Sequence, residues 1–166
     1  MVEVIFSQEI PEIGSGDVLI KGIARDAGGR SKVAVFTSDP SIDPIGSCIG
    51  QRGSRITTVI DELGGEKVDI IQYSDDAVTY VKNALSPAKV SDVTLDETTK
   101  EATVAVAPDQ FSLAIGREGQ NVRLAAELTG WKIKVVELGA EEKVVESDGS
   151  EVVGVEEAVT EEPKAD

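Results

Sequence analysis

The sequence contains no histidine and only one cysteine, Cys48, and these two scarcities exclude several kinds of chemistry. Without histidine there is no Ser-His-Asp triad, no histidine base and no histidine-ligated zinc. One cysteine cannot supply a disulfide framework or a CxxC metal site. No apolar run approaches the roughly 20 residues of a membrane-spanning helix, and the first residues lack the basic region of a signal peptide. We therefore expect a soluble, cytoplasmic chain without catalytic residues, metal or cofactor.

Aromatic residues are also scarce, with three Phe, two Tyr and one Trp among 166 residues. Aliphatic residues are plentiful, so a core can form, but it must be built from Val, Ile, Leu and Ala. The length allows one medium-sized domain or two small ones. The shortage of aromatic rings disfavours nucleic-acid binding by a stacking platform.

Basic residues are outnumbered by acidic ones, 16 to 31, which gives a net charge of −15. Residues 139–166 hold ten of the acidic residues and two lysines, a net charge of −8, with no aromatic residue and no sustained apolar periodicity. This composition predicts a disordered acidic tail. The tail could be a solubilising extension or could compete for a basic surface. The rest of the chain can still present a local basic groove, because salt screens distant charges.

Two Gly-x-x-Gly segments, Gly50–Gly53 and Gly116–Gly119, stand 66 residues apart in the chain. Each follows an aspartate by seven residues, Asp43 or Asp109, and each precedes an apolar pattern with helical spacing that ends in glycine. An alternating strand pattern comes next in both halves. Such an internal duplication determines the architecture.

The segments upstream of the two motifs also correspond, because each half has a predicted β-hairpin, at 18–36 and at 90–106. The order helix, strand, strand, helix, Gly-x-x-Gly, helix, strand predicts an α+β fold in each half, with a three-stranded sheet packed by helices in layers. The expected domains are 1–8 as an N-terminal connector, 9–74 as the first domain, 75–138 as the second and 139–166 as the tail.

These segments resemble KH domains in the type II, prokaryotic order, and in particular the tandem KH domains of the bacterial NusA family of transcription factors. The resemblance covers roughly residues 9–138. The matching stretches are 18–25, 39–46, 49–55, 59–70, 83–90 and 113–133. Members of that family also have a polymerase-binding domain and an OB-fold domain. Neither is expected in this chain, so it resembles a fragment of such a protein.

The Gly-x-x-Gly loops are the predicted RNA-binding sites. Glycine lets a phosphate backbone approach closely, the following helix offers unpaired N–H groups, and KH loops clamp about four nucleotides. Glu118 should repel phosphate, and we expect it to point outward or to reach a base amino group. Ile49, Ile56, Ile115 and Val122 could form an aliphatic groove floor or belong to the core. The predicted RNA-binding residues are Ile49, Gly50, Gln51, Arg52, Gly53, Ser54, Arg55, Ile115, Gly116, Arg117, Glu118, Gly119, Gln120, Asn121 and Arg123.

The resemblance implies a monomer that binds single-stranded nascent RNA near RNA polymerase, together with other Nus-type factors, and regulates elongation, pausing, termination and antitermination. No membrane partner is expected. Two alternatives are a ribosome-associated KH protein that acts in RNA maturation and a protein-interaction scaffold without RNA binding. The acidic net charge motivates the scaffold.

Overall fold

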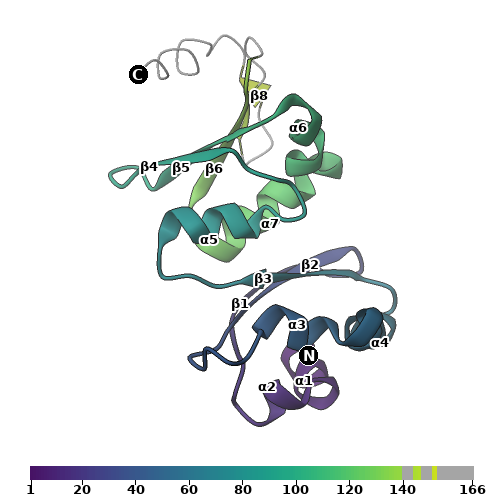
Figure 1. Ribbon diagram of the computed structural model, residues 1–166. Helices are drawn as coiled ribbons and strands as arrows, with labels where there is room; N and C mark the ends of the chain where they lie inside the picture. Colours follow the sequence, from purple (N-terminus) through teal and green to yellow (C-terminus); the bar gives the residue numbers. More distant parts are fainter. Residues whose placement is uncertain (140–143, 147–150, 153–166) are drawn as a thin grey trace. The chain divides into compact units, whose positions relative to one another are not determined.

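The computed structural model describes residues 1–139, 144–146 and 151–152, and it divides the chain into two compact units, Met1–Asp75 and Asp76–Asp166. Each unit has its own β-sheet and its own set of helices (Figure 1). Within the described ranges, no helix is both long enough and apolar enough to cross a membrane.

The first unit builds a three-stranded sheet in the order β1-β2-β3, with β1 antiparallel and β3 parallel to the central β2. The helices lie on one face of this sheet (Figure 1). Its elements are α1 (Val2–Glu9), α2 (Pro11–Gly14), β1 (Leu19–Asp26), β2 (Arg30–Phe36), α3 (Pro44–Ile49), the 3₁₀ turn η1 (Gln51–Gly53), α4 (Ser54–Glu62) and β3 (Lys67–Gln72).

The core of the first unit follows from the alternation of side chains along its strands. Val33 and Val35 project from β2 toward the helices, where Val59 of α4 and Phe6 of α1 are also fully buried. The buried core cluster is aliphatic apart from Phe6 and Cys48, in line with the composition.

Residues 1–8, expected to be a connector, contain most of α1 and belong to the first unit. Val2, Ile5 and Phe6 of this helix are buried in the core cluster. The hydrophobic spacing Val2, Ile5, Phe6 places all three on one helical face, which explains why the segment packs against the domain.

The second unit repeats the order of the first. α5 begins at its N-cap Asp76, whose carboxylate accepts a hydrogen bond from the Thr79 backbone N–H. The alternation of buried residues along β5 places Ala102, Val104 and Val106 in the core. The elements are α5 (Ala77–Ala84), β4 (Asp92–Asp96), β5 (Glu101–Val106), α6 (Pro108–Ile115), the 3₁₀ turn η2 (Arg117–Gly119), α7 (Gln120–Thr129) and β6 (Lys132–Glu137).

The second sheet is larger than the predicted three strands, because β7 (Val144–Glu146) and β8 (Glu151–Val152) extend it in the order β4-β5-β6-β7-β8. β7 pairs antiparallel with β6, and β8 pairs antiparallel with β7. An edge strand offers unpaired N–H and C=O groups, so β6 can accept a further strand. This part of the chain therefore departs from the predicted disordered tail, and the remainder of that tail lies outside the described residues.

Candidate nucleic-acid interface

The first Gly-x-x-Gly loop joins α3 to α4 through backbone conformations that are left-handed or otherwise have positive φ. Gly50 ends α3 at φ 76° and ψ 175°, Arg52 has φ 55° and ψ 29°, and Gly53 has φ 76° and ψ 17° as the N-cap of α4. The Gly53 N–H donates a hydrogen bond to the Gly50 carbonyl at 3.1 Å. Residues with side chains adopt these angles rarely, so the two glycines follow from the backbone path.

The second loop repeats this geometry closely. Gly116 has φ 79° and ψ 168°, Glu118 has φ 56° and ψ 30°, and Gly119 has φ 73° and ψ 13°. The Gly119 N–H donates to the Gly116 carbonyl at 3.1 Å, as in the first loop. The internal duplication predicted from the sequence therefore extends to individual backbone angles.

The first glycine of each loop is required by packing inside the domain. A Cβ atom at Gly50 would lie 2.9 Å from the Arg55 backbone nitrogen, and one at Gly116 would lie 2.7 Å from the Asn121 backbone nitrogen. The second glycines have room, since a Cβ at Gly53 would meet only Thr57 Oγ1 at 4.0 Å and one at Gly119 would meet nothing within 4 Å. The second glycine of each loop is therefore required by its positive φ and not by packing against its own unit.

Arg55 and Asn121 occupy the same place in the two loops, five residues after the first glycine, and both hold the loop together. Arg55 Nη1 donates to Glu12 Oε1 and to the Ser47 carbonyl, both at 2.8 Å. Asn121 is fully buried, and its Nδ2 donates to the carbonyls of Leu85 at 3.0 Å and Ala114 at 2.9 Å. The amide of Asn121 is thus enclosed in the domain and used to hold the loop, so its predicted contact with RNA stays a prediction that this burial disfavours.

The other predicted RNA-binding residues lie at or near the surface of the loops, except Gly119, which is buried. Arg123 is exposed one turn beyond the second loop, and its Nη1 donates to the Glu118 carbonyl at 3.0 Å. Gly50, Gly53, Ile115, Gly116 and Gln120 are half-buried, while Ile49, Gln51, Arg52, Ser54, Arg117 and Glu118 are exposed.

The four residues considered for an aliphatic groove floor separate into two groups. Val122 is fully buried in its unit, and Ile56 packs against the first core. Ile49 is 37% exposed and Ile115 is half-buried, so both are accessible next to their glycines. Ile49 and Ile115 are therefore the better candidates for a binding surface, whereas Val122 belongs to the core and Ile56, although half-buried, packs against it.

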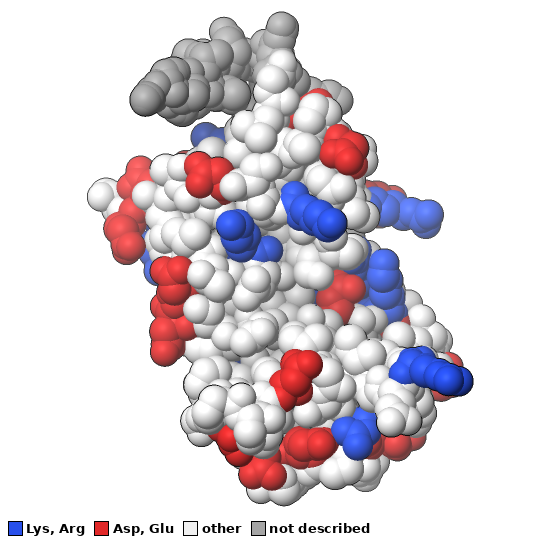
Figure 2. Space-filling model, in the orientation of Figure 1, with Lys and Arg blue, Asp and Glu red and all other residues white. Residues whose placement is uncertain are grey.

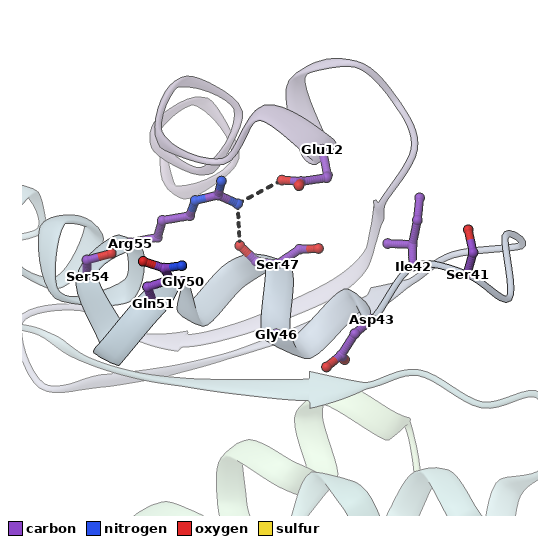
Figure 3. Close-up of a pocket in the computed structure, with 10 residues that line it drawn as sticks. All are labelled: Glu12, Ser41, Ile42, Asp43, Gly46, Ser47, Gly50, Gln51, Ser54 and Arg55. Carbon is purple, nitrogen blue, oxygen red and sulfur yellow. Dashed lines mark hydrogen bonds and ion pairs between the residues drawn. The ribbon is translucent and has the colours of Figure 1, made fainter.

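An open groove of about 880 Å³ adjoins the first loop (Figure 3). The Glu12–Arg55 ion pair spans one side of it, joining α2 to α4. The sequence pattern indicated Gly50, Gln51, Ser54 and Arg55 here but missed the residues that α2 and the start of α3 contribute. The spacing of Asp43 before Gly50 was the one signal that could have pointed to them. The missed residues are Glu12, Ser41, Ile42, Asp43, Gly46 and Ser47.

Three of the four basic residues of the first hairpin are paired with carboxylates of the same unit, and the fourth, Lys21, lies over the rings of Phe36 and Tyr73. The guanidinium of Arg25 forms a bidentate ion pair with the Glu66 carboxylate, and this pairing lowers the pKa of Glu66. Arg30 and Lys32 both reach Asp69 Oδ2, at 2.8 Å and 2.9 Å. In the view of Figure 2, basic and acidic side chains are interspersed on the surfaces of both units. The exposed cations of the loops are therefore the better candidates for phosphate contact.

The buried Lys32 makes the stability of the first unit depend on pH. Burial lowers the pKa of Lys32 to about 8, against the opposing effect of Asp69. Between pH 8 and the unfolded value near 10.4, the unfolded state binds more protons, so the free energy of unfolding rises with pH. Burial raises the pKa of Cys48 to about 12, which opposes the rise above pH 9. We expect the free energy of unfolding, measured by urea denaturation, to increase by about 1 kcal/mol from pH 7.5 to pH 9.

The matched control for this pH dependence is Lys32→Met, which removes the titrating group and keeps an unbranched apolar stem. Its free energy of unfolding should not rise between pH 7.5 and 9, and the raised pKa of Cys48 should make it fall slightly toward pH 9. Equal slopes in Lys32→Met and the unsubstituted chain would assign the pH dependence to another group.

Comparison with known proteins places both units in one family of domains. The model of the NusA-like first KH domain matches residues 1–73, α1 included, and that of the NusA-like second KH domain matches residues 77–143. The crystal structure of APE1850 aligns with 81% of this chain and 95% of its own, with a TM-score of 0.54 and 24% identity, which shows a shared fold.

Three curated relatives carry the name transcription termination/antitermination protein NusA. The Bacillus subtilis protein is 54% identical over 131 residues, covering 79% of this chain and 35% of its own length. The Thermus thermophilus protein is 56% identical over 133 residues, covering 80% and 34%. The protein of Mycobacterium tuberculosis H37Rv is 52% identical over 136 residues, covering 81% and 39%. The chain thus spans little more than a third of the length of these relatives.

Proposed function

We propose, because the chain belongs to the NusA-like family of tandem KH domains, that it binds single-stranded RNA through its two Gly-x-x-Gly loops. The observation that carries this proposal is the repeated loop geometry, in which a Cβ atom at the second glycine would meet no backbone atom of its own unit in either copy. Both Gly-x-x-Gly loops hold their third residue, Arg52 or Glu118, in a strained left-handed backbone conformation. A loop that only connected two helices would not need this strain.

Each loop has the features required to hold a phosphate group. The first N–H groups of a helical turn have no acceptor within the turn, and in the first loop these belong to Gln51 and Arg52 of η1. The missing Cβ of Gly53 lets a phosphate approach the start of α4, where the helix dipole favours negative charge. Arg52 adds a cationic side chain at the same place. About four nucleotides of backbone can be held at each loop in this way.

The wider role proposed for the chain follows from the names of its relatives. We infer that it acts in the cytoplasm, within a factor that regulates transcription elongation, pausing, termination and antitermination, without enzymatic activity and as a monomer. Nascent RNA, RNA polymerase and other Nus-type factors are the proposed partners. The names of the relatives support transcription over RNA maturation on the ribosome.

The salt dependence of RNA affinity tests the proposal. Arg52, Arg117 and Arg123 are the exposed arginines of the two loops, so about three phosphates should be neutralised. With about −0.7 per phosphate on a single strand, the slope of log affinity against log salt should be about −2. Arg52→Ala should make the slope shallower by about 0.7, measured by fluorescence anisotropy with a single-stranded RNA decamer.

Lys82→Ala provides the matched control, since Lys82 is an exposed cation in the last turn of α5, away from both loops in the sequence. It should leave the slope unchanged. Absence of RNA binding by the unsubstituted chain at low salt would refute the proposed function and favour the protein-interaction scaffold.

A further inference from the structure

Arg52 and Glu118 occupy the same position in the two loops but carry opposite charges. Their backbone angles agree within 1°, at φ 55° and ψ 29° for Arg52 and φ 56° and ψ 30° for Glu118. Each is the third residue of its Gly-x-x-Gly motif, directly before the second glycine. The two loops therefore share one backbone conformation but present side chains of opposite charge at this position.

Neither side chain is explained by the stability of its own domain. Both residues are exposed, and both adopt a left-handed conformation that long side chains rarely take. Within the ranges that the structure describes, neither side chain has a hydrogen bond or ion pair. The backbone carbonyl of Glu118, and not its carboxylate, accepts the hydrogen bond from Arg123. A strained, exposed residue without an internal partner points to a contact with a ligand.

The two residues between the glycines, which form the apex of each loop, carry different net charges in the two loops. Gln51 and Arg52 give the first loop a charge of +1, whereas Arg117 and Glu118 cancel in the second. A carboxylate at the apex repels a phosphate but accepts hydrogen bonds from N–H donors. Adenine, cytosine and guanine each carry an exocyclic amino group, and uracil has none. Acidic side chains accept hydrogen bonds from such amino groups in nucleic-acid complexes.

We propose that Glu118 selects the base held at the second loop, by accepting a hydrogen bond from an exocyclic amino group and so disfavouring uracil there. Arg52 at the first loop contacts phosphate and does not discriminate among bases. This inference rests on the proposed RNA binding and adds a specificity-determining residue to it. The tandem pair then has one loop that provides affinity and one that adds sequence preference.

The test uses the full chain and an adenosine RNA decamer in which one adenosine at a time is replaced by purine riboside. That nucleoside lacks only the exocyclic amino group, so the ring and the phosphate backbone stay the same. With the unsubstituted chain, one or two positions should show an affinity loss of about tenfold or more, as one charge-assisted hydrogen bond would give. With Glu118→Ala, all positions should bind alike. Glu118→Gln keeps an acceptor without the charge, so it should bind more tightly overall and retain a weaker position effect.

Arg52→Ala is the matched control at the equivalent place in the first loop. It should lower affinity for every decamer and leave the position effect intact. Tight binding without any position effect, or an effect that persists in Glu118→Ala, would overturn the selectivity of Glu118 while leaving RNA binding in place. Failure of the unsubstituted chain to bind any decamer would overturn the proposed function, and the selectivity with it.

Discussion

Replacing Gly53 and Gly119 together by aspartate is expected to lower the affinity for single-stranded RNA by about two orders of magnitude. Each carboxylate would stand where a phosphate approaches, and two charges about 4 Å apart near a protein surface repel by about 1–4 kcal/mol. The fold should survive, because a Cβ at either glycine meets open space and aspartate is among the residues that tolerate left-handed backbone best. Fluorescence anisotropy gives the affinity, and a circular-dichroism melt monitors the fold.

The matched control replaces the same two glycines by asparagine. Asparagine has nearly the shape of aspartate and the same tolerance of positive φ, but it has no charge. The asparagine pair should keep most of the affinity, with a melting temperature close to that of the aspartate pair. Equal losses in the two pairs would show that bulk, not phosphate repulsion, is responsible. Unchanged affinity in both would remove the loops from the RNA interface.

Gly116→Ala is expected to destabilise the second unit by about 2–4 kcal/mol. The added methyl group would lie 2.7 Å from the Asn121 backbone nitrogen and 2.8 Å from its Cβ, so the start of α7 must shift. Overpacking costs roughly 1–3 kcal/mol, and alanine at φ 79° and ψ 168°, a backbone region that is essentially restricted to glycine, costs at least about 1 kcal/mol more. The shift would also disturb the Asn121 hydrogen bonds to the Leu85 and Ala114 carbonyls. Urea denaturation followed by Trp131 fluorescence measures the loss.

Gly119→Ala separates the two contributions, because Gly119 has φ 73° but its Cβ would meet nothing within 4 Å. Only the conformational penalty applies there, so the expected loss is about 1 kcal/mol. The same argument predicts that aspartate at Gly50 disrupts the first loop itself, which makes Gly53 the better position for testing phosphate contact. Similar losses in Gly116→Ala and Gly119→Ala would mean that α7 yields to the methyl group at little cost.

The sequence alone determined the duplicated plan of the protein. Glycine spacing, hydrophobic periodicity and hairpin signals act over a few residues, so they can be read without knowing the fold. They predicted the two hairpins, the two Gly-x-x-Gly loops and the helices on either side, all of which the structure contains. The resemblance to NusA-like KH domains, which the family models confirm, depended on those same local patterns.

Tertiary structure decided which of the predicted loop residues are available to a ligand. Arg55 is bound to Glu12, 43 residues away, and Asn121 to the Leu85 carbonyl, 36 residues away. Arg25 is paired with Glu66 across 41 residues. Local patterns carry no information on such partners, because they meet only when the helices pack on the sheet. α1 joined the first core for the same reason, since its short apolar face gains stability only against the residues it buries.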